Sequence, residues 1–236
     1  MTNVDLNELL MHFNLTRQEA TIYTTLYTEG PLTGYEVAKL TGISRSNTYT
    51  SLAGLVDKGA AYVIEGTATR YTPVPIEEFC NNKIRQLQQI KRDLIKGMPA
   101  QREATEGYIT IKGEKHILEK MRNMVAEAKE RLYLSVAKPT LSFILPELKA
   151  AISRGLKVVI ITDEPFELEG AIIYHTEKPP YQIRLIVDST NVLTGDIADG
   201  EFSTCLYSKK KNLVELIKES MKNELTLIDL MKGKRP

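Results

Sequence analysis

The chain has 236 residues, of which 42% are hydrophobic and 26% are charged, and its formal net charge at pH 7 is +1. This length and composition are typical of one large globular domain or of two smaller ones. No apolar run approaches the roughly 20 residues that span a bilayer. The N-terminal stretch MTNVDLNELL also lacks the basic and apolar regions of a secretory signal. We therefore expect a cytoplasmic protein with no membrane partner.

Neither a disulfide framework nor a metal site is expected. The two cysteines, Cys80 and Cys205, are too few and too far apart for a disulfide framework or for a zinc site with paired ligands. No spacing of carboxylates resembles a metal site. The sequence therefore predicts no metal and no other cofactor.

Two capping boxes mark the first helices of the chain. The stretches TRQE at 16–19 and TGYE at 33–36 each place a hydroxyl and a carboxylate where they satisfy free backbone donors at a helix start. Helices are therefore expected to begin directly after each threonine and to end near Gly30 and Gly42. The second helix is expected to turn Val37, Ala38 and Leu40 inward.

A third helix follows Ser44, which is a typical N-cap residue. Helical spacing predicts an inward face of Tyr49, Leu52, Leu55 and Val56. The outward face is predicted to carry Arg45, Ser46, Asn47, Thr50 and Gly54. An extended stretch at 61–65, a turn at 66–69 and a second strand at 70–73 come next. This order of elements predicts a winged helix-turn-helix domain over residues 1–74.

The third helix is the candidate recognition helix, because the major groove of DNA admits one α-helix. Arg45 could form a bidentate pair with guanine and Asn47 with adenine, whereas short hydroxyl side chains suit phosphate. The phosphate candidates are Ser44, Ser46 and Thr50, and the candidates in the wing are Thr67, Thr69 and Arg70. Residues 1–74 carry five basic and seven acidic side chains, so modest affinity is expected. A winged helix used only for protein contacts remains an alternative.

A long helix is expected to follow over residues 75–104. Apolar residues recur at intervals of four and three along it, broken at Lys91, and predict a coiled coil that pairs two chains. The seam consists of Cys80, Ile84, Leu87, Leu94 and Met98. Packing of this helix against its own C-terminal domain is the alternative. In a homodimer, two winged helices would read an inverted repeat on double-stranded DNA.

The stretch from Leu15 to Phe79 resembles the DNA-binding domain of the TrmB family of archaeal and bacterial transcriptional regulators. GISRSNTYTSLAGLVDKG is similar to that family's recognition helix, and the resemblance adds Tyr49 to the DNA-binding candidates. RYTPVPIEEF is similar to the junction between strand and coiled coil. The resemblance implies a dimeric regulator that responds to a small effector, which is a sugar in the best-understood members.

Residues 105–236 alternate between strand-like and helix-like stretches, which indicates an α/β domain. The expected strands are 108–111, 131–136, 157–162 and 183–187, and the expected helices are 114–129, 145–154 and 213–231. The fold class is therefore α+β, with a winged helix-turn-helix, a connecting helix and a C-terminal α/β domain. In the TrmB family this last region is similar to half of a phospholipase D domain.

Phospholipase D chemistry needs the pattern H-x-K-x4-D, which this sequence lacks. If Asp188 is aligned with the aspartate, Tyr181 occupies the histidine position and Ile183 the lysine position. Gly195 matches the glycine that follows, but Asp196 and Ala198 replace the serine and the asparagine. We therefore expect a sensor and not an enzyme.

Effector candidates follow the strands, because ligands of open α/β sheets bind beyond the carboxyl ends of the strands. This rule nominates Ser135, Lys138, Asp163, Glu164, Asp188 and Asn191. The leading hypothesis is a dimeric, effector-responsive transcriptional regulator. A DNA-binding dimer whose C-terminal domain docks another protein is the alternative, and a residual phosphodiesterase is a third.

Overall fold

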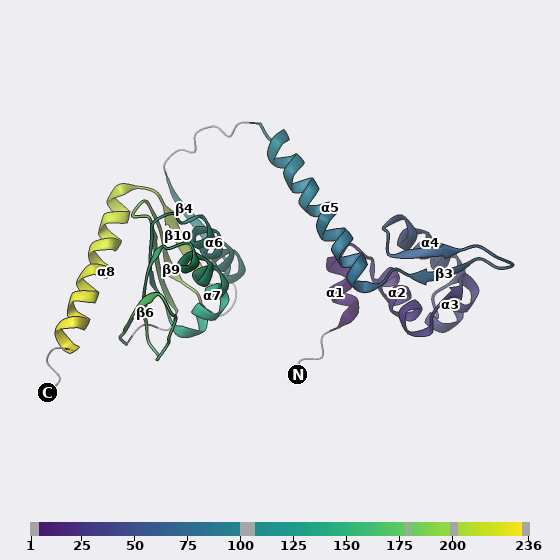
Figure 1. Ribbon diagram of the computed structural model, residues 1–236, viewed down its shortest axis with the longest axis horizontal. Coiled ribbons are helices and arrows are strands. Elements are labelled where there is room, and N and C mark those ends of the chain that lie inside the picture. Colours follow the sequence, from purple (N-terminus) through teal and green to yellow (C-terminus); the bar gives the residue numbers. More distant parts are fainter. Residues whose placement is uncertain (1–4, 100–106, 178, 180, 199–202, 233–236) are drawn as a thin grey trace. The chain divides into compact units, whose positions relative to one another are not determined.

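The computed structural model describes residues 5–99, 107–177, 179, 181–198 and 203–232. The chain divides into two compact units, residues 1–100 and residues 101–236, and each is described by itself (Figure 1). The boundary expected between residues 104 and 105 lies outside the described residues.

The N-terminal unit is a bundle of short helices with a small antiparallel sheet and one long helix. Both capping boxes form in full, so that α2 and α3 start directly after Thr16 and Thr33. The three-stranded sheet has the order β1-β3-β2. The helices are α1 (Leu6–His12), α2 (Arg17–Glu29), α3 (Gly34–Thr41), α4 (Arg45–Asp57) and α5 (Ile76–Gly97), and the strands are β1 (Leu32–Thr33), β2 (Ala61–Ile64) and β3 (Arg70–Pro73).

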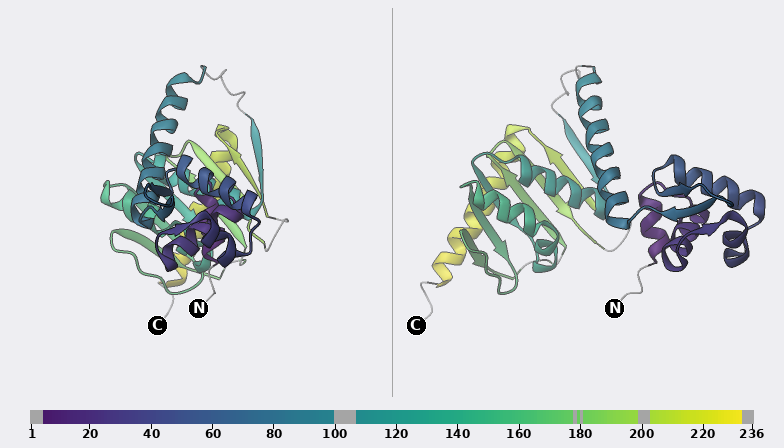
Figure 2. Two further views of the ribbon diagram at one scale, coloured as in Figure 1. Left: turned by 90° about the vertical axis from the view of Figure 1, so that its right-hand side faces the viewer. Right: turned by 45° about the vertical axis from the view of Figure 1, so that its right-hand side comes forward.

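The core of this unit fixes the start of α5. Phe79, in the first turn of α5, is fully buried, and its ring packs against Tyr23 of α2 and against Phe13 just after α1. The hydroxyl of Tyr23 donates a hydrogen bond of 2.7 Å to the carbonyl of Val74, just before the helix. Beyond its first turns α5 extends past the rest of the unit (Figure 2, right). Helix α1 was not predicted, although Asp5 caps it by accepting a hydrogen bond from the amide of Asn7.

Three residues do not lie on the helix face that helical spacing predicted. Leu40 is 55% exposed and Tyr49 is 51% exposed, so neither packs into the core as expected. Thr48 and Ser51 are buried on α4 in place of Tyr49. Gly54 was expected to face outward, yet a Cβ atom there would collide with the carboxylate of Glu19 on α2. Helix α4 is therefore rotated relative to the predicted face, because its close approach to α2 favours small side chains.

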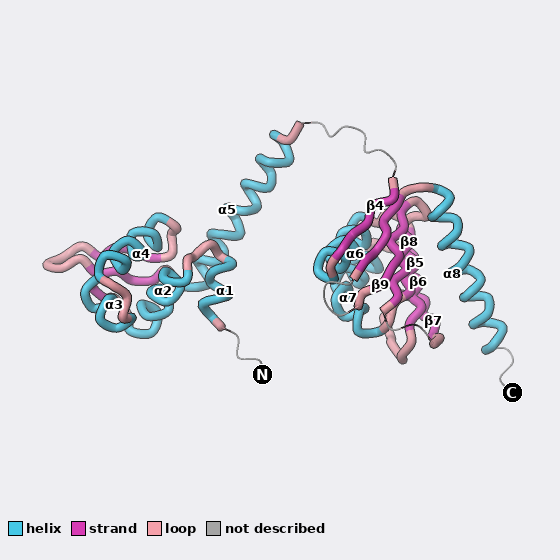
Figure 3. The backbone as a smooth tube through the Cα atoms, turned by 180° about the vertical axis from the view of Figure 1, so that it is seen from behind, coloured by secondary structure: helices cyan, strands magenta, loops and turns pink. Residues whose placement is uncertain are grey.

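The C-terminal unit has three layers: two helices, a seven-stranded sheet and a third helix on the opposite face (Figure 3). Along the sheet the strand order is β4-β10-β9-β8-β5-β6-β7. The strands are β4 (Tyr108–Lys112), β5 (Arg131–Ser135), β6 (Lys157–Thr162), β7 (Ala171–His175), β8 (Gln182–Val187), β9 (Asn191–Asp196) and β10 (Thr204–Ser208), and the helices are α6 (Glu114–Glu127), α7 (Lys138–Ser153) and α8 (Lys211–Lys232).

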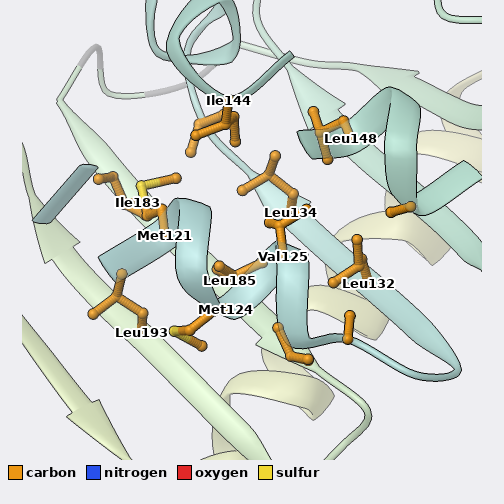
Figure 4. Close-up of a cluster of buried hydrophobic side chains, with 14 of the residues drawn as sticks. Met121, Met124, Val125, Leu132, Leu134, Ile144, Leu148, Ile183, Leu185 and Leu193 are labelled. Atoms are coloured by element: carbon orange, nitrogen blue, oxygen red, sulfur yellow. The ribbon is translucent and has the colours of Figure 1, made fainter. Parts of the chain in front are cut away.

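Each face of the sheet has its own apolar cluster. Side chains of α6 and α7 pack on one face against Leu132, Leu134 and their neighbours (Figure 4). On the other face, Val214, Met221 and Ile228 of α8 pack against the sheet. The alternation of side chains along each strand supplies both clusters, since successive residues point to opposite faces.

The sheet is mixed. Strands β5, β6 and β7 are parallel to one another, but β8 is antiparallel to β5. Strands β7, β9 and β10 were not predicted. Helix α7 begins at Lys138 and not at 145, with Pro139 in its first turn and Pro146 in its interior.

Candidate functional site

The first turns of α4 form an exposed polar surface. Ser44 caps the helix, with its hydroxyl accepting a hydrogen bond of 3.4 Å from the amide of Asn47. The buried hydroxyl of Thr48 donates a hydrogen bond of 3.0 Å to the carbonyl of Ser44, which anchors the same turn to the core. The exposed candidates on this surface are Ser44, Arg45, Ser46, Asn47, Tyr49 and Thr50.

Helix α3 supports this surface from the side. The guanidinium of Arg45 lies over the ring of Tyr35, 4.8 Å from its centroid, which is a cation–π arrangement. The ring of Tyr49 covers Gly34 so closely that no Cβ atom would fit there. Tyr35 was not among the sequence candidates, because position 35 offered no signal beyond its place inside a capping box. Arg45 is thus preoriented at the outer end of α4.

Of the three candidates in the wing, two are exposed and the third is bound to other residues of the same unit. Thr67 and Thr69 are exposed in the turn between β2 and β3. Arg70, in contrast, is held by its own unit: its Nη1 donates a hydrogen bond of 2.9 Å to the carbonyl of Pro31 and lies 3.8 Å from Oε2 of Glu36. Hydrogen bonds from Thr33 lower the pKa of the Glu36 carboxyl. Arg70 therefore ties the wing to the start of α3.

An apolar stripe runs along α5 beyond the core. Ile84, Leu87 and Leu94 are 44%, 57% and 59% exposed. Met98 caps the end of the helix and is also exposed. Cys80 differs from the other seam candidates, because it packs against the core of the N-terminal unit, where burial raises the pKa of its thiol.

The same stripe continues into an apolar hollow at the base of α5. The hollow has a volume of about 340 Å³ and lies between α1, α2 and α5. Its lining includes Leu6, Leu9, Phe13, Tyr27, Ile76 and Cys80. Exposed apolar side chains are thus found both in this hollow and along α5, where Lys91 interrupts them.

The effector candidates of the C-terminal unit fall into two groups at opposite ends of the sheet. Because β5 and β6 are parallel, Ser135, Lys138, Asp163 and Glu164 lie at one end. Because β8 is antiparallel to β5, Asp188 and Asn191 lie at the other end, beside Arg131 at the start of β5. The six candidates therefore do not form one cluster.

Within the first group the polar side chains bind one another. Oδ1 of Asp163 accepts hydrogen bonds from the amides of Lys138 at 2.9 Å and Glu164 at 3.0 Å. Burial raises the pKa of Asp163, but these hydrogen bonds outweigh burial and lower it. Nζ of Lys138 lies 3.2 Å from Oε2 of Glu164, and the hydroxyl of Ser135 accepts a hydrogen bond from Arg184. This arrangement fixes the start of α7.

In the second group, Asp188 binds the backbone of the loop between α6 and β5. Its carboxylate accepts hydrogen bonds from the amides of Lys129, Glu130 and Arg131, at 2.9, 2.8 and 3.0 Å. Burial raises the pKa of Asp188, but the three amides outweigh burial and lower it. Asp188 has φ of +51°, a backbone conformation that aspartate tolerates better than most residues.

The positions compared with phospholipase D do not converge on a catalytic centre. Tyr181 is exposed and Ile183 is buried in the core. Gly195 has φ of +156°, and a Cβ atom there would collide with the backbone of Thr204 on β10, so close strand packing accounts for this glycine. Within the described part of the chain, no three His, Cys, Asp or Glu side chains are grouped as metal ligands.

Comparisons with known proteins agree with this architecture. The family model described as sugar-specific transcriptional regulator TrmB matches residues 9–77, and the model for the N-terminal subdomain of the TrmB EBD matches residues 107–219. Together these models cover well over half of the chain. The chain belongs to the TrmB family of transcriptional regulators.

Individual relatives extend along most of this TrmB-family chain. Protein YrhO of Bacillus subtilis is 30% identical over 239 residues, which span 97% of this chain and 87% of YrhO. The DNA-binding HTH-type transcriptional repressor TrmBL2 of Thermococcus kodakarensis is 27% identical over 200 residues, 76% of each chain. The solved structure of Nuc, a phospholipase D family member from Salmonella typhimurium, is similar with a TM-score of 0.41 and 16% identity over 51% of this chain and 94% of Nuc.

Over the described residues of this TrmB-family chain, no helix combines the length and the apolar character needed to cross a bilayer.

Proposed function

We propose that this regulator binds double-stranded DNA as a homodimer and places the first turns of α4 in the major groove. The observation that carries the proposal is the exposed set of Arg45, Asn47 and short hydroxyl side chains at one end of a helix whose other face is buried. Arg45 pairs with guanine, Asn47 with adenine, and Ser44, Ser46 and Thr50 contact phosphate. Tyr49 and the wing residues Thr67 and Thr69 extend the contact to flanking nucleotides.

The apolar surface of α5 supports the homodimer. Exposed leucine and isoleucine side chains at heptad spacing are typical of a helix that pairs with a second helix. A dimer of this kind presents two recognition helices related by twofold symmetry, so its operator is an inverted repeat.

The test of DNA recognition is the variant Arg45→Ala. Arg45 contacts only the exposed ring of Tyr35 among the described residues, so its removal leaves the fold intact while deleting the guanine contact. We expect loss of retention of a palindromic fragment from the gene's own upstream region in a gel-shift assay. Arg17→Ala, which removes an equal charge at the start of α2, is the matched control. Undiminished binding by Arg45→Ala would refute the assigned contact.

We further infer that the C-terminal unit senses a small molecule and carries out no phosphodiester hydrolysis. The TrmB family model is described as sugar-specific, and the histidine and lysine of the hydrolase pattern are replaced by Tyr181 and Ile183. Thermal-shift screening tests sensing, because a ligand at 100 times its dissociation constant adds about 2.7 kcal/mol to stability. If a broad panel gives no shift, a protein-docking role for this unit is favoured.

A further inference from the structure

A groove lies between α8 and the sheet, and none of the effector candidates that the sequence nominated lines it. Its volume is about 260 Å³. One row of side chains across four neighbouring strands contributes to its lining: Ile186 on β8 is paired with Tyr133 on β5, Tyr133 with Val159 on β6, and Val159 with Ile172 on β7. Residues in register across a sheet share one face, so this row forms a continuous apolar and aromatic floor.

Helix α8 supplies one wall of the groove. Met221 and Leu225, one turn apart on α8, line the groove together with Tyr174 of β7. Met221 is buried against the sheet, which fixes the height of the helix above the floor. The groove is thus built by two rigid elements and not by a loop.

Three lysines from two separate elements line this groove. Lys218 and Lys222 lie one turn apart on α8, and Lys157 begins β6. Within the described parts of the chain, none of these ammonium groups forms an ion pair with a carboxylate. Like charges four residues apart on a helix repel each other. An anion placed among them would relieve this repulsion.

The positive charge extends beyond the groove along the start of α8. Lys218 also lines a neighbouring hollow of about 290 Å³ together with Lys209 and Lys211. In this hollow Glu215 lies 3.8 Å from the ammonium group of Lys211 and offsets part of its charge. Lys218 therefore lies between two pairs of lysines, Lys157 with Lys222 in the groove and Lys209 with Lys211 in the hollow.

The composition of the groove identifies the class of ligand. Its described lining contains neither a carboxylate nor an amide, which are the groups that hold the hydroxyls of a neutral sugar. Three ammonium groups favour a compact dianion, since charge-assisted hydrogen bonds to phosphate are strong. The rings of Tyr133 and Tyr174 and the aliphatic floor favour a flat or ring-shaped body.

We propose that this groove binds a small phosphomonoester with a ring-shaped body, with the phosphate among Lys157, Lys218 and Lys222 and the ring on the Tyr133 row. The inference deepens the proposed function, because it rests on the C-terminal unit being a sensor. Binding connects β6 to α8 through the shared phosphate, so the ligand fixes α8 against the sheet.

The experiment measures binding of two probes to the full chain by isothermal titration calorimetry. The probes are phenyl phosphate, which carries an aromatic ring, and glucose 6-phosphate, which carries a sugar ring. The matched controls are inorganic phosphate, which lacks the ring, and glucose, which lacks the phosphate. We expect at least one phosphomonoester to bind at least tenfold more tightly than either control. Which of the two binds identifies the ring as aromatic or saccharide.

Variants locate the binding. K218A/K222A removes two of the three ammonium groups and is expected to weaken binding of the phosphomonoester at least tenfold. K115A/K149A removes two exposed lysines from α6 and α7 on the opposite side of the sheet and is expected to change nothing. Ile172→Trp fills the floor without altering charge, and it is expected to block binding as well.

Several outcomes would overturn the proposal. These are no binding of either phosphomonoester, equal binding of inorganic phosphate or of glucose, unchanged binding by K218A/K222A, or an equal loss in K115A/K149A. Gel-shift assays on the same samples separate this inference from the proposed function. If K218A/K222A retains the operator fragment while no probe binds the wild type, only the groove is refuted. If the wild type ignores DNA but binds a probe, only the DNA-binding proposal is refuted.

Discussion

Glu19 joins the start of α2 to the end of α4 through its carboxylate. Oε2 accepts hydrogen bonds of 2.6 Å both from the amide of Thr16 and from Nζ of Lys58, the C-cap residue of α4. The Glu19 side chain is only 7% exposed. Burial raises the pKa of this carboxyl, but the hydrogen bonds from Lys58 and Thr16 outweigh burial and lower it. A carboxyl of this kind stabilises the fold in its charged form.

Glu19→Gln should lower the stability of the N-terminal unit by about 1 to 2 kcal/mol at neutral pH, because it removes a charged hydrogen-bond acceptor while keeping the volume. Since the folded pKa is lowered, the contribution of Glu19 is present above the unfolded pKa of about 4.3 and is lost as the pH falls through the folded pKa. The difference in stability between variant and wild type should therefore shrink as the pH falls below about 4.3.

This effect is measured by unfolding the protein in urea and detecting the unfolding of residues 5–97 by hydrogen exchange. Glu65→Gln, which removes an exposed carboxylate next to the wing turn, is the control and should be neutral. A difference for Glu19→Gln that does not shrink as the pH falls below about 4.3 would contradict a contribution from the charged carboxylate.

At the scale of elements, α5 combines a buried start with an exposed apolar stripe. Leu87→Glu should leave the fold of the monomer intact, because Leu87 is 57% exposed in a single chain. In a dimer, each copy would bury a carboxylate in the seam, so dimerisation should weaken at least a hundredfold, or by about 3 kcal/mol. Sedimentation equilibrium measures the change. Asn82→Glu adds the same charge on the opposite face of α5 and should leave the dimer unaltered.

Lys91 gives a prediction of opposite sign, because it interrupts the stripe between Leu87 and Leu94. A single polar residue in the core of a coiled coil lowers its stability. Lys91→Leu should therefore strengthen dimerisation, and the same sedimentation experiment should show a lower dissociation constant. A weaker dimer would place Lys91 at the rim of the interface and not in its centre.

The sequence predicted elements well where local chemistry decides and poorly where pairing between strands decides. The starts of α2 and α3 follow from capping boxes, which act within four residues. The direction of β8 is set by its partners, and no residue near 182–187 reveals it. The rule that ligands bind beyond the carboxyl ends of strands therefore nominated both Asp163 and Asp188, although they lie at opposite ends of the sheet. Likewise, Tyr49 and Gly54 could not be oriented before the contact of α4 with α2 was known.

For the whole molecule, the electrostatics of the N-terminal unit limits how it binds DNA. Residues 1–74 carry a net charge of −2, and two of their cations, Lys58 and Arg70, lie close to Glu19 and Glu36. Few charges remain for phosphate. The binding constant should therefore fall only gently with salt, with a logarithmic slope no steeper than about −4 for a dimer that makes about two phosphate contacts per copy.

Fluorescence anisotropy of a labelled operator between 50 and 200 mM KCl measures this slope. A slope near −8 would contradict the prediction and would mean that lysines outside the winged helix, such as those near the start of α8, also contact the DNA backbone.

Because Phe79 anchors the start of α5, the number of residues in α5 also sets the angle about the helix axis between the apolar stripe and the recognition helix α4. Each residue of an α-helix turns the chain by about 100°. One residue inserted between Cys80 and Ile84 would rotate each recognition helix by about 100° relative to the dimer seam, so that the two helices would no longer fit the half-sites of the same operator. Seven inserted residues would restore their phase to within about 20° while moving them outward by about 10 Å along the helix axis. Helical phase, and not length alone, would then set which spacing of half-sites the dimer accepts.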